Sequence, residues 1–140
     1  MRIFSLLLAG CAVTAFTQAG AHPAIDLADW SASFDSEVHP GMHGELIARE
    51  TADQTEVTLK LTGAPPDSTL PWHIHEGKCG PGEIVGGADA YTPMVPAADS
   101  SATSTATLPL VLDETKDYHV NVHASPTDMG TIVACGDLTR

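Results

Sequence analysis

Hydrophobic and polar residues alternate along several short segments of this chain, and no segment shows a helical period. The clearest alternation places Val57, Leu59 and Leu61 on one face of a segment whose other face is polar, as expected for a half-buried strand. The same criterion predicts strands at 30–34, 44–50, 70–75, 101–112, 118–123 and 131–135. Short strands separated by turn residues predict an all-β sandwich or barrel.

One long segment lacks periodicity. Residues 76–100 are rich in glycine and proline, which predicts a long surface loop, and such loops in compact domains are usually functional. The Ser- and Thr-rich segment 101–112 has the composition of either a strand or a linker. The alternation of Leu108, Leu110 and Leu112 at its end favours a strand.

The N-terminal residues have the order of a secretory signal peptide: one early cation, an apolar run, and small residues ending at Ala21. The apolar run is too short to remain in a bilayer as a span. We therefore predict a signal peptide at 1–21 and a single domain at 22–140, periplasmic or secreted. The alternative is a lipoprotein anchored through Cys11, and the ten residues before this cysteine are few for such a signal.

Cleavage would leave two cysteines, Cys79 and Cys135, in the exported chain. An even pair in an oxidising compartment predicts a disulfide, with two buried free thiols as the alternative.

The charge of the chain excludes one class of partner. Six Lys and Arg residues against 18 Asp and Glu residues give a formal net charge of −12. This charge repels phosphate backbones and anionic headgroups, so we expect no nucleic-acid partner, and no membrane contact unless Cys11 is lipidated.

Candidate metal ligands lie on two of the predicted strands. In the segment 72–75, His73 and His75 point to one side and the apolar residues to the other, with the two Cα atoms about 6.5 Å apart. On the segment 118–123, His119 and His123 also share a face with each other. If the two strands are neighbours, their imidazoles meet beneath the long loop. Imidazoles without thiolates or several carboxylates favour copper or zinc over calcium or magnesium.

These segments resemble the bacterial copper/zinc superoxide dismutases. His73–Gly80 (HIHEGKCG) is similar to their copper-ligand strand and half-cystine, and Val133–Leu138 (VACGDL) to their C-terminal half-cystine strand. Between them, Gly86–Pro93 is similar to their Gly-Gly-His-Tyr-x-Pro stretch, and Asn121–His123 lies where their last copper histidine is expected. The resemblance covers most of residues 44–138. The Asn-Val-His sequence also resembles CHRD domains, more loosely.

The resemblance implies a Greek-key barrel of about eight antiparallel strands. It also implies a disulfide between Cys79 and Cys135, and one copper ion bound by His73, His75 and His123.

The chain departs from this family at two functional positions. Ala88 or Asp89 stands where the family has a histidine that bridges copper and zinc, and no histidine occurs between His75 and His119. We therefore expect no zinc. Ile132 replaces the arginine that draws superoxide to the metal, so we expect a copper-binding protein with weak or absent dismutase activity.

Two alternatives remain open at the level of sequence. One is a copper-only superoxide dismutase in which Lys78 guides the anion. The other is an interaction domain whose histidines bind no metal.

Further residues are candidates for extra ligands or for groups that support a ligand: His22, His39, Met42, His43, His119 and Asp128. As a new N-terminus, His22 would offer copper an amine and an imidazole. His39 and His43 flank a Pro-Gly turn beside Met42, and for these residues an exposed turn is favoured over a metal site. For His119, packing beside a ligand is favoured over ligation, and Asp128 either orients a ligand imidazole or is a solvated loop acid.

Overall fold

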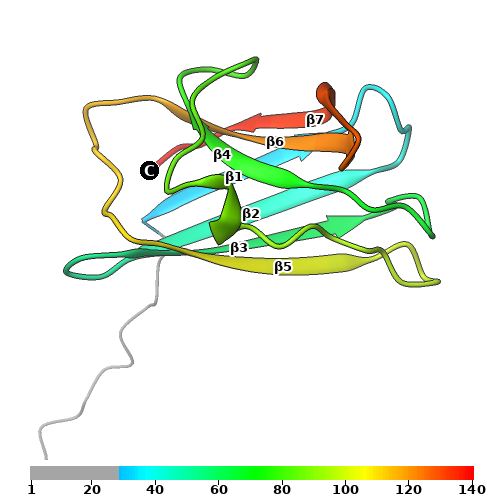
Figure 1. The fold of residues 1–140 in the computed structure, drawn as a ribbon, viewed down its shortest axis with the longest axis horizontal. Coiled ribbons are helices and arrows are strands. Elements are labelled where there is room, and N and C mark those ends of the chain that lie inside the picture. Colours follow the sequence, from blue (N-terminus) through cyan, green and yellow to red (C-terminus); the bar gives the residue numbers. More distant parts are fainter. Residues whose placement is uncertain (1–28) are drawn as a thin grey trace, which may run out of the picture.

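The computed structural model describes residues 29–140 as a sandwich of two antiparallel sheets (Figure 1). One sheet has the strand order β1-β2-β3-β5 and the other β4-β6-β7. The strands are β1 (Trp30–Asp35), β2 (His43–Glu50), β3 (Thr55–Thr62), β4 (Trp72–Glu76), β5 (Ala102–Leu108), β6 (Tyr118–Ser125) and β7 (Asp128–Asp137), and the short 3-10 helix η1 spans Ala88–Ala90. The all-β prediction is confirmed, with seven strands in the described residues against about eight expected.

The proposed signal peptide, Cys11 and His22 lie outside the described residues. Within 29–140, no helix is long and apolar enough to cross a membrane.

The chain passes from one sheet to the other three times, between β3 and β4, between β4 and β5, and between β5 and β6. This connectivity is compatible with the expected Greek key. At one side of the sandwich, Ser31 of β1 and Thr139 exchange two backbone hydrogen bonds of 2.7 and 2.8 Å, which join the two sheets.

The alternation seen in the sequence determines which face of each strand is buried. Val57, Leu59 and Leu61 of β3 are at most 1% exposed and pack into the core between the sheets. The strand predicted at 101–112 forms, so it is no linker. It ends at Leu108 because the following Pro109 cannot donate a ladder hydrogen bond.

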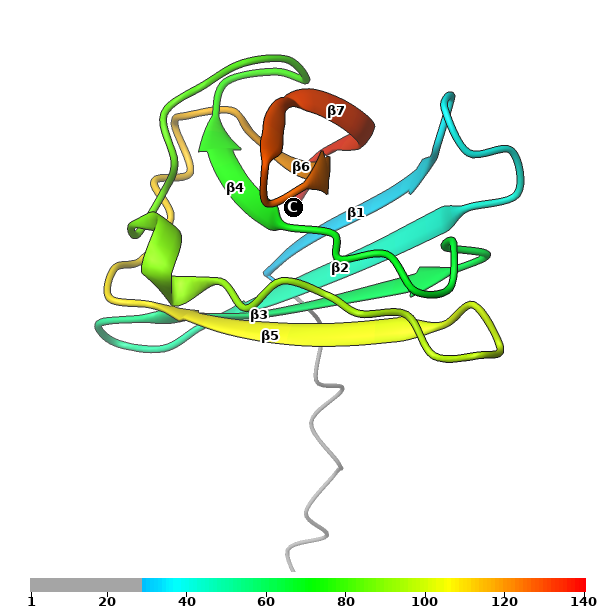
Figure 2. The same ribbon diagram turned by 45° about the vertical axis from the view of Figure 1, so that its right-hand side comes forward.

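Strand β6 departs from the alternation, because all six residues of Tyr118–His123 are buried. One face of β6 packs into the core, and the other is covered by the chain that leaves β4 and returns through η1 to β5 (Figure 2). The long loop predicted from the glycine and proline content therefore covers the histidine-bearing face of β4 and β6.

The ring of Phe34 fits between the two sheets because two glycines leave room for it. Gly44 is its cross-strand partner on β2, and Gly136 lies on β7 of the other sheet. A Cβ atom on either glycine would overlap the Phe34 ring. The aromatic side chain thus contacts both sheets at the edge where β1 approaches β7.

We predict that Gly44→Ala lowers the free energy of unfolding by about 1–3 kcal/mol, because the added methyl group overpacks this position. Chemical denaturation measures the change. Ser33→Ala, at an exposed position of β1, is the control and is expected to change stability by less than about 0.5 kcal/mol. Equal midpoints for the two variants would contradict the contact.

Candidate metal centre

Three buried histidines from two neighbouring strands form a cluster. Strands β4 and β6 pair antiparallel, with His73 opposite Asn121 and His75 opposite His119. One nitrogen from each of His73, His75 and His123 lies within 4.8 Å of the other two, and each residue is 5% exposed. The expectation that the two histidine-bearing strands are neighbours is confirmed, and the three side chains are close enough to bind one metal ion.

The β6–β7 ladder is irregular beside His123. On the β4 side this residue lies opposite Pro71, just before the start of β4, and its backbone nitrogen donates to the Pro71 carbonyl at 2.8 Å. On its other side, the β6–β7 register shifts both between Val122 and His123 and between His123 and Ser125. Between Val122 and His123 the extra residue, Val133, lies on β7. Strand β6 itself therefore keeps its alternation, which places His123 on the same face as His119 and Asn121.

A hydrogen bond to a carbonyl oxygen shows which nitrogen of His75 is available. Nδ1 of His75 lies 2.8 Å from the carbonyl oxygen of Gly82, which only accepts, so Nδ1 donates and Nε2 keeps its lone pair. That Nε2 atom is buried without a hydrogen-bond partner among the described residues. Nδ1 of His73 and Nε2 of His123 lie 3.3 Å apart. The cluster therefore presents imidazole nitrogens from three rings to one small volume.

Burial keeps these imidazoles neutral. Burial, together with the smaller effects of the neighbouring His123 and His75, lowers the pKa of His73 to about 4. Burial is also the largest cause of the lowered pKa values of His75 and His123. A neutral ring retains the lone pair that a metal ion needs, so the cluster is ready to bind a cation at neutral pH.

His119 lies beside the cluster with each ring nitrogen within hydrogen-bond distance of a carbonyl oxygen, and a neutral ring donates to one of the two. Its ring stacks on that of His75, with centroids 5.3 Å apart and planes inclined by 14°. Nδ1 lies 2.8 Å from the Gly77 oxygen, and Nε2 lies 2.8 Å from the Gly80 oxygen. His119 is therefore placed to support His75 rather than to ligate a metal.

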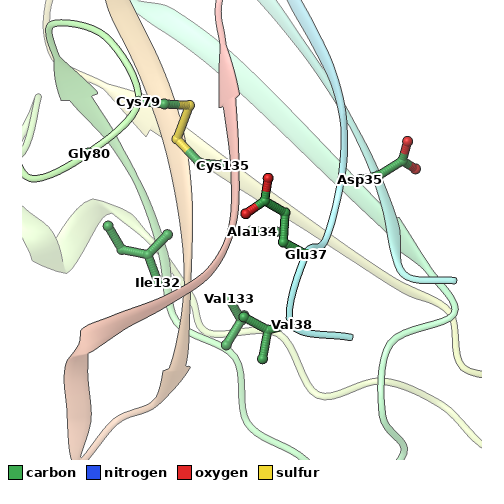
Figure 3. Close-up of a pocket in the computed structure, with 9 residues that line it drawn as sticks. All are labelled: Asp35, Glu37, Val38, Cys79, Gly80, Ile132, Val133, Ala134 and Cys135. Carbon is green, nitrogen blue, oxygen red and sulfur yellow. A yellow bond between two sulfur atoms is a disulfide. The ribbon is translucent and has the colours of Figure 1, made fainter. Parts of the chain in front are cut away.

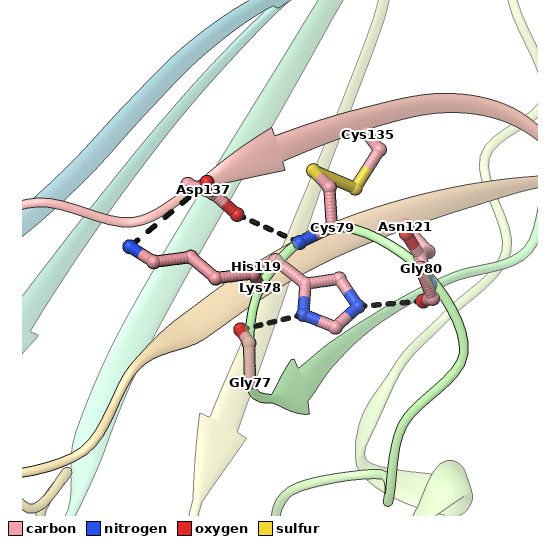
Figure 4. Close-up of a disulfide and its surroundings, with 8 residues drawn as sticks. All are labelled: Gly77, Lys78, Cys79, Gly80, His119, Asn121, Cys135 and Asp137. Atoms are coloured by element: carbon pink, nitrogen blue, oxygen red, sulfur yellow. Dashed lines mark hydrogen bonds and ion pairs between the residues drawn. A yellow bond between two sulfur atoms is a disulfide. The ribbon is translucent and has the colours of Figure 1, made fainter.

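A disulfide joins Cys79 and Cys135, which excludes the alternative of two free thiols (Figure 4). The cysteines are separated by 56 positions, and closing such a loop stabilises the fold by about 4 kcal/mol in the chain-entropy model. The bond ties the loop after β4 to β7. Disulfides of this kind persist in non-reducing compartments.

The other predicted candidates lie apart from the group of three. Met42 is 1% exposed and belongs to the hydrophobic core, which argues against the less favoured alternative of a Met–His metal site at this turn. His43 pairs with Asp35, whose carboxylate is 3.0 Å from Nδ1. Asp128 is exposed and accepts a hydrogen bond from the Thr131 backbone nitrogen.

The turn between β1 and β2 holds the remaining candidate. His39 is half-buried there, and its carbonyl oxygen accepts a hydrogen bond of 3.0 Å from the Met42 nitrogen. It is not part of the group of three histidines.

The surroundings of the cluster offer little positive charge. Lys78, the candidate anion guide, lies with Nζ 3.1 Å from an Asp117 oxygen and 4.0 Å from an Asp137 oxygen. Ile132 is half-buried and pairs with His123 in the β6–β7 ladder. The charge of Lys78 is thus paired with the carboxylates of Asp117 and Asp137. The apolar residue Ile132 lies opposite His123.

Sequence reasoning gave no role to Tyr91, which packs against the cluster. Its ring meets that of His73 edge to face, with centroids 5.2 Å apart, and its hydroxyl donates to the Val85 carbonyl at 2.7 Å. Burial raises the pKa of the Tyr91 hydroxyl. The resemblance to the dismutases had included this tyrosine without indicating a contact.

A cavity of about 380 Å³ lies next to the disulfide, between β7 and the end of β1 (Figure 3). The residues that line it are Asp35, Glu37, Val38, Cys79, Gly80, Ile132, Val133, Ala134 and Cys135. No histidine lines this cavity, so it is separate from the candidate metal centre.

Comparison with protein-family models gives no match to this sequence, and no curated protein matches it significantly. The function proposed below therefore depends on the geometry of the cluster and on the residues themselves.

We predict that the metal-free protein loses stability as the pH falls from about 6.5 to 4. The folded-state pKa of His73 is below its unfolded value, so in this range the unfolded chain binds a proton that the folded chain does not. For His73 alone the loss at pH 4 is at most about 3 kcal/mol. Denaturation in the presence of a chelator measures it. His73→Gln should flatten the pH dependence, and parallel curves for the two proteins would contradict the assignment.

Proposed function

We propose that this protein is an exported copper-binding protein that holds one copper ion through His73, His75 and His123. One observation carries the proposal: Nε2 of His75 is buried without a partner at the point where nitrogens of the other two rings converge. An unpaired buried polar atom is destabilising, and a bound cation would satisfy it.

The chemistry of the donors supports copper. The group contains three imidazoles and neither a thiolate nor a carboxylate, which disfavours calcium and magnesium. Among divalent first-row ions, Cu²⁺ binds such nitrogen donors most tightly. The resemblance of His73–Gly80 to a copper-ligand strand supports the same metal over zinc.

The chain's own groups orient the ligands and exclude water. The Gly82 carbonyl fixes the Nδ1–H form of His75, which leaves Nε2 for the metal. Tyr91 packs on the ring of His73, and burial keeps the rings neutral. When bound, copper would supply one-electron chemistry between its Cu(I) and Cu(II) states.

The same features support copper holding over superoxide turnover. A dismutase needs a positive field and an open approach for the anion. The histidines are 5% exposed, Lys78 is paired with carboxylates, and Ile132 stands beside His123. Export is proposed from the signal-like residues 1–21 and is supported by the disulfide, which requires a non-reducing compartment.

Titration of the purified mature protein with Cu(II), followed by electron paramagnetic resonance, tests the metal centre. We expect one copper per chain with nitrogen ligands, and a loss of affinity of at least about tenfold in His73→Ala and in His123→Ala. His43→Ala, which removes a surface histidine, is the matched control and should bind as the parent does. Equal, weak uptake by all four proteins would refute the site and favour an interaction domain.

A superoxide-decay assay on the copper-loaded protein tests the absence of rapid turnover. We expect a rate no faster than that of chelated copper in solution. A second-order rate constant approaching the diffusional ceiling of about 10⁹ M⁻¹s⁻¹ would instead identify a copper-only superoxide dismutase.

A further inference from the structure

The loop after β4 is held to the histidine face by two side chains of β6 (Figure 4). His119 places Nδ1 2.8 Å from the Gly77 oxygen and Nε2 2.8 Å from the Gly80 oxygen. Asn121 donates from Nδ2 to the same Gly80 oxygen at 2.8 Å. His119 and Asn121 are 0% and 1% exposed, so both act from inside the protein.

The same loop carries the carbonyl group that orients His75. Gly82, two residues beyond Gly80, accepts the hydrogen bond from Nδ1 of His75 at 2.8 Å. A Cβ atom on Gly82 would lie 3.1 Å from Cβ of His75 and 3.3 Å from Cε1 of His119. Gly82 therefore packs against both of the stacked rings, and it can do so because it has no side chain.

These contacts connect the loop and the two stacked histidines in a closed series. His75 is hydrogen-bonded to Gly82, which follows Gly80 by two residues, Gly80 is within hydrogen-bond distance of His119, and the His119 ring stacks on that of His75. The positions of the loop and of the two rings therefore depend on one another. The His75 ring is thus fixed from its edge by the loop and from its face by His119.

The disulfide alone does not fix this geometry. It ties the loop to β7 only at Cys79, three residues before Gly82. The intervening Gly80 has a φ of 143°, and Gly77 before the cysteine has a φ of 102°, values that favour glycine. Backbone hydrogen bonds hold the two ends of this stretch, from the Gly77 nitrogen to the Asp117 oxygen at 2.7 Å and from the Glu76 nitrogen to the Glu83 oxygen at 3.1 Å. Between these ends, His119 and Asn121 contact Gly80, two residues before the Gly82 carbonyl.

We propose that His119 is a positioning residue of the metal centre. With Asn121 it fixes Gly80, and thereby holds the Gly82 carbonyl against Nδ1 of His75 and keeps Nε2 of that ring directed at the metal. The role in metal binding rests on the proposed function, whereas the orientation of His75 is a property of the metal-free protein.

Nitrogen-15 spectra of histidine in the metal-free protein test this orientation directly. The parent should show the Nδ1–H form of His75. In His119→Phe, which keeps a flat ring for stacking and removes the ring nitrogens that contact Gly77 and Gly80, the two neutral forms of His75 should be mixed. His43→Phe replaces a surface histidine and should leave His75 unchanged. Retention of the Nδ1–H form in His119→Phe would overturn the proposal.

Copper release provides the second readout. Transfer of Cu(II) to a chelator should be about 10- to 100-fold faster from His119→Phe than from the parent, with altered copper hyperfine splitting. His119→Gln, which keeps one donor, should be intermediate. A lowered melting temperature with unchanged release and spectrum would show a purely structural role and refute the proposal.

Two further outcomes are distinguishable. If His119→Phe does not fold, Asn121→Leu removes one of the two donors to Gly80 and should show the same changes to a smaller degree; unchanged spectra and release would then overturn the proposal. If the parent takes up no copper, the proposed function fails, and the His75 spectra still decide the role of His119.

Discussion

The register between β4 and β6 determines both the core and the cluster. The pairing of Ile74 with Val120 and of Trp72 with Val122 places apolar side chains that are 0% exposed on the core face. Because side chains alternate along a strand, the same register puts the histidines together on the opposite face. A shift by one residue would expose the apolar set and separate the imidazoles. The burial energy of the core therefore also holds the ligands of the candidate metal centre in place.

Both faces of β6 are buried, so its polar face needs a cover. The loop after β4 provides this cover and is also part of the candidate metal centre. The Gly82 carbonyl accepts from Nδ1 of His75, and the Gly77 and Gly80 carbonyls offer two acceptors to the ring of His119, so the buried N–H groups have partners. The disulfide ties this cover to β7. Fold stability, loop position and ligand orientation are consequently coupled, because they depend on one short stretch of backbone.

The seven strands and the histidine-bearing faces could be predicted because the alternation of apolar and polar residues is visible in the sequence itself. The bulges of the β6–β7 ladder beside His123 could not, since they depend on how β6 pairs with β7. The glycine carbonyls that contact His75 and His119 were also missed. Every residue has a backbone carbonyl, so the sequence does not show which one accepts a hydrogen bond. Met42 was considered beside a metal because its neighbours are histidines, yet its position in the core depends on strands distant in sequence. The pairing of Lys78 with Asp117 and Asp137 is likewise a tertiary contact.

Under the proposed function, affinity for copper and turnover of superoxide would make opposite demands on this cluster. Burial lowers the pKa values of the ligands and keeps their lone pairs available, which favours metal binding. The same burial restricts the approach of a second, anionic reactant, and a net charge of −12 repels it at longer range. Converting this cluster into an efficient dismutase would require opening the cover and adding a cation near Ile132. Opening the cover would in turn release the Gly82 carbonyl that orients His75, so under the proposed function this geometry suits holding a metal ion better than rapid turnover.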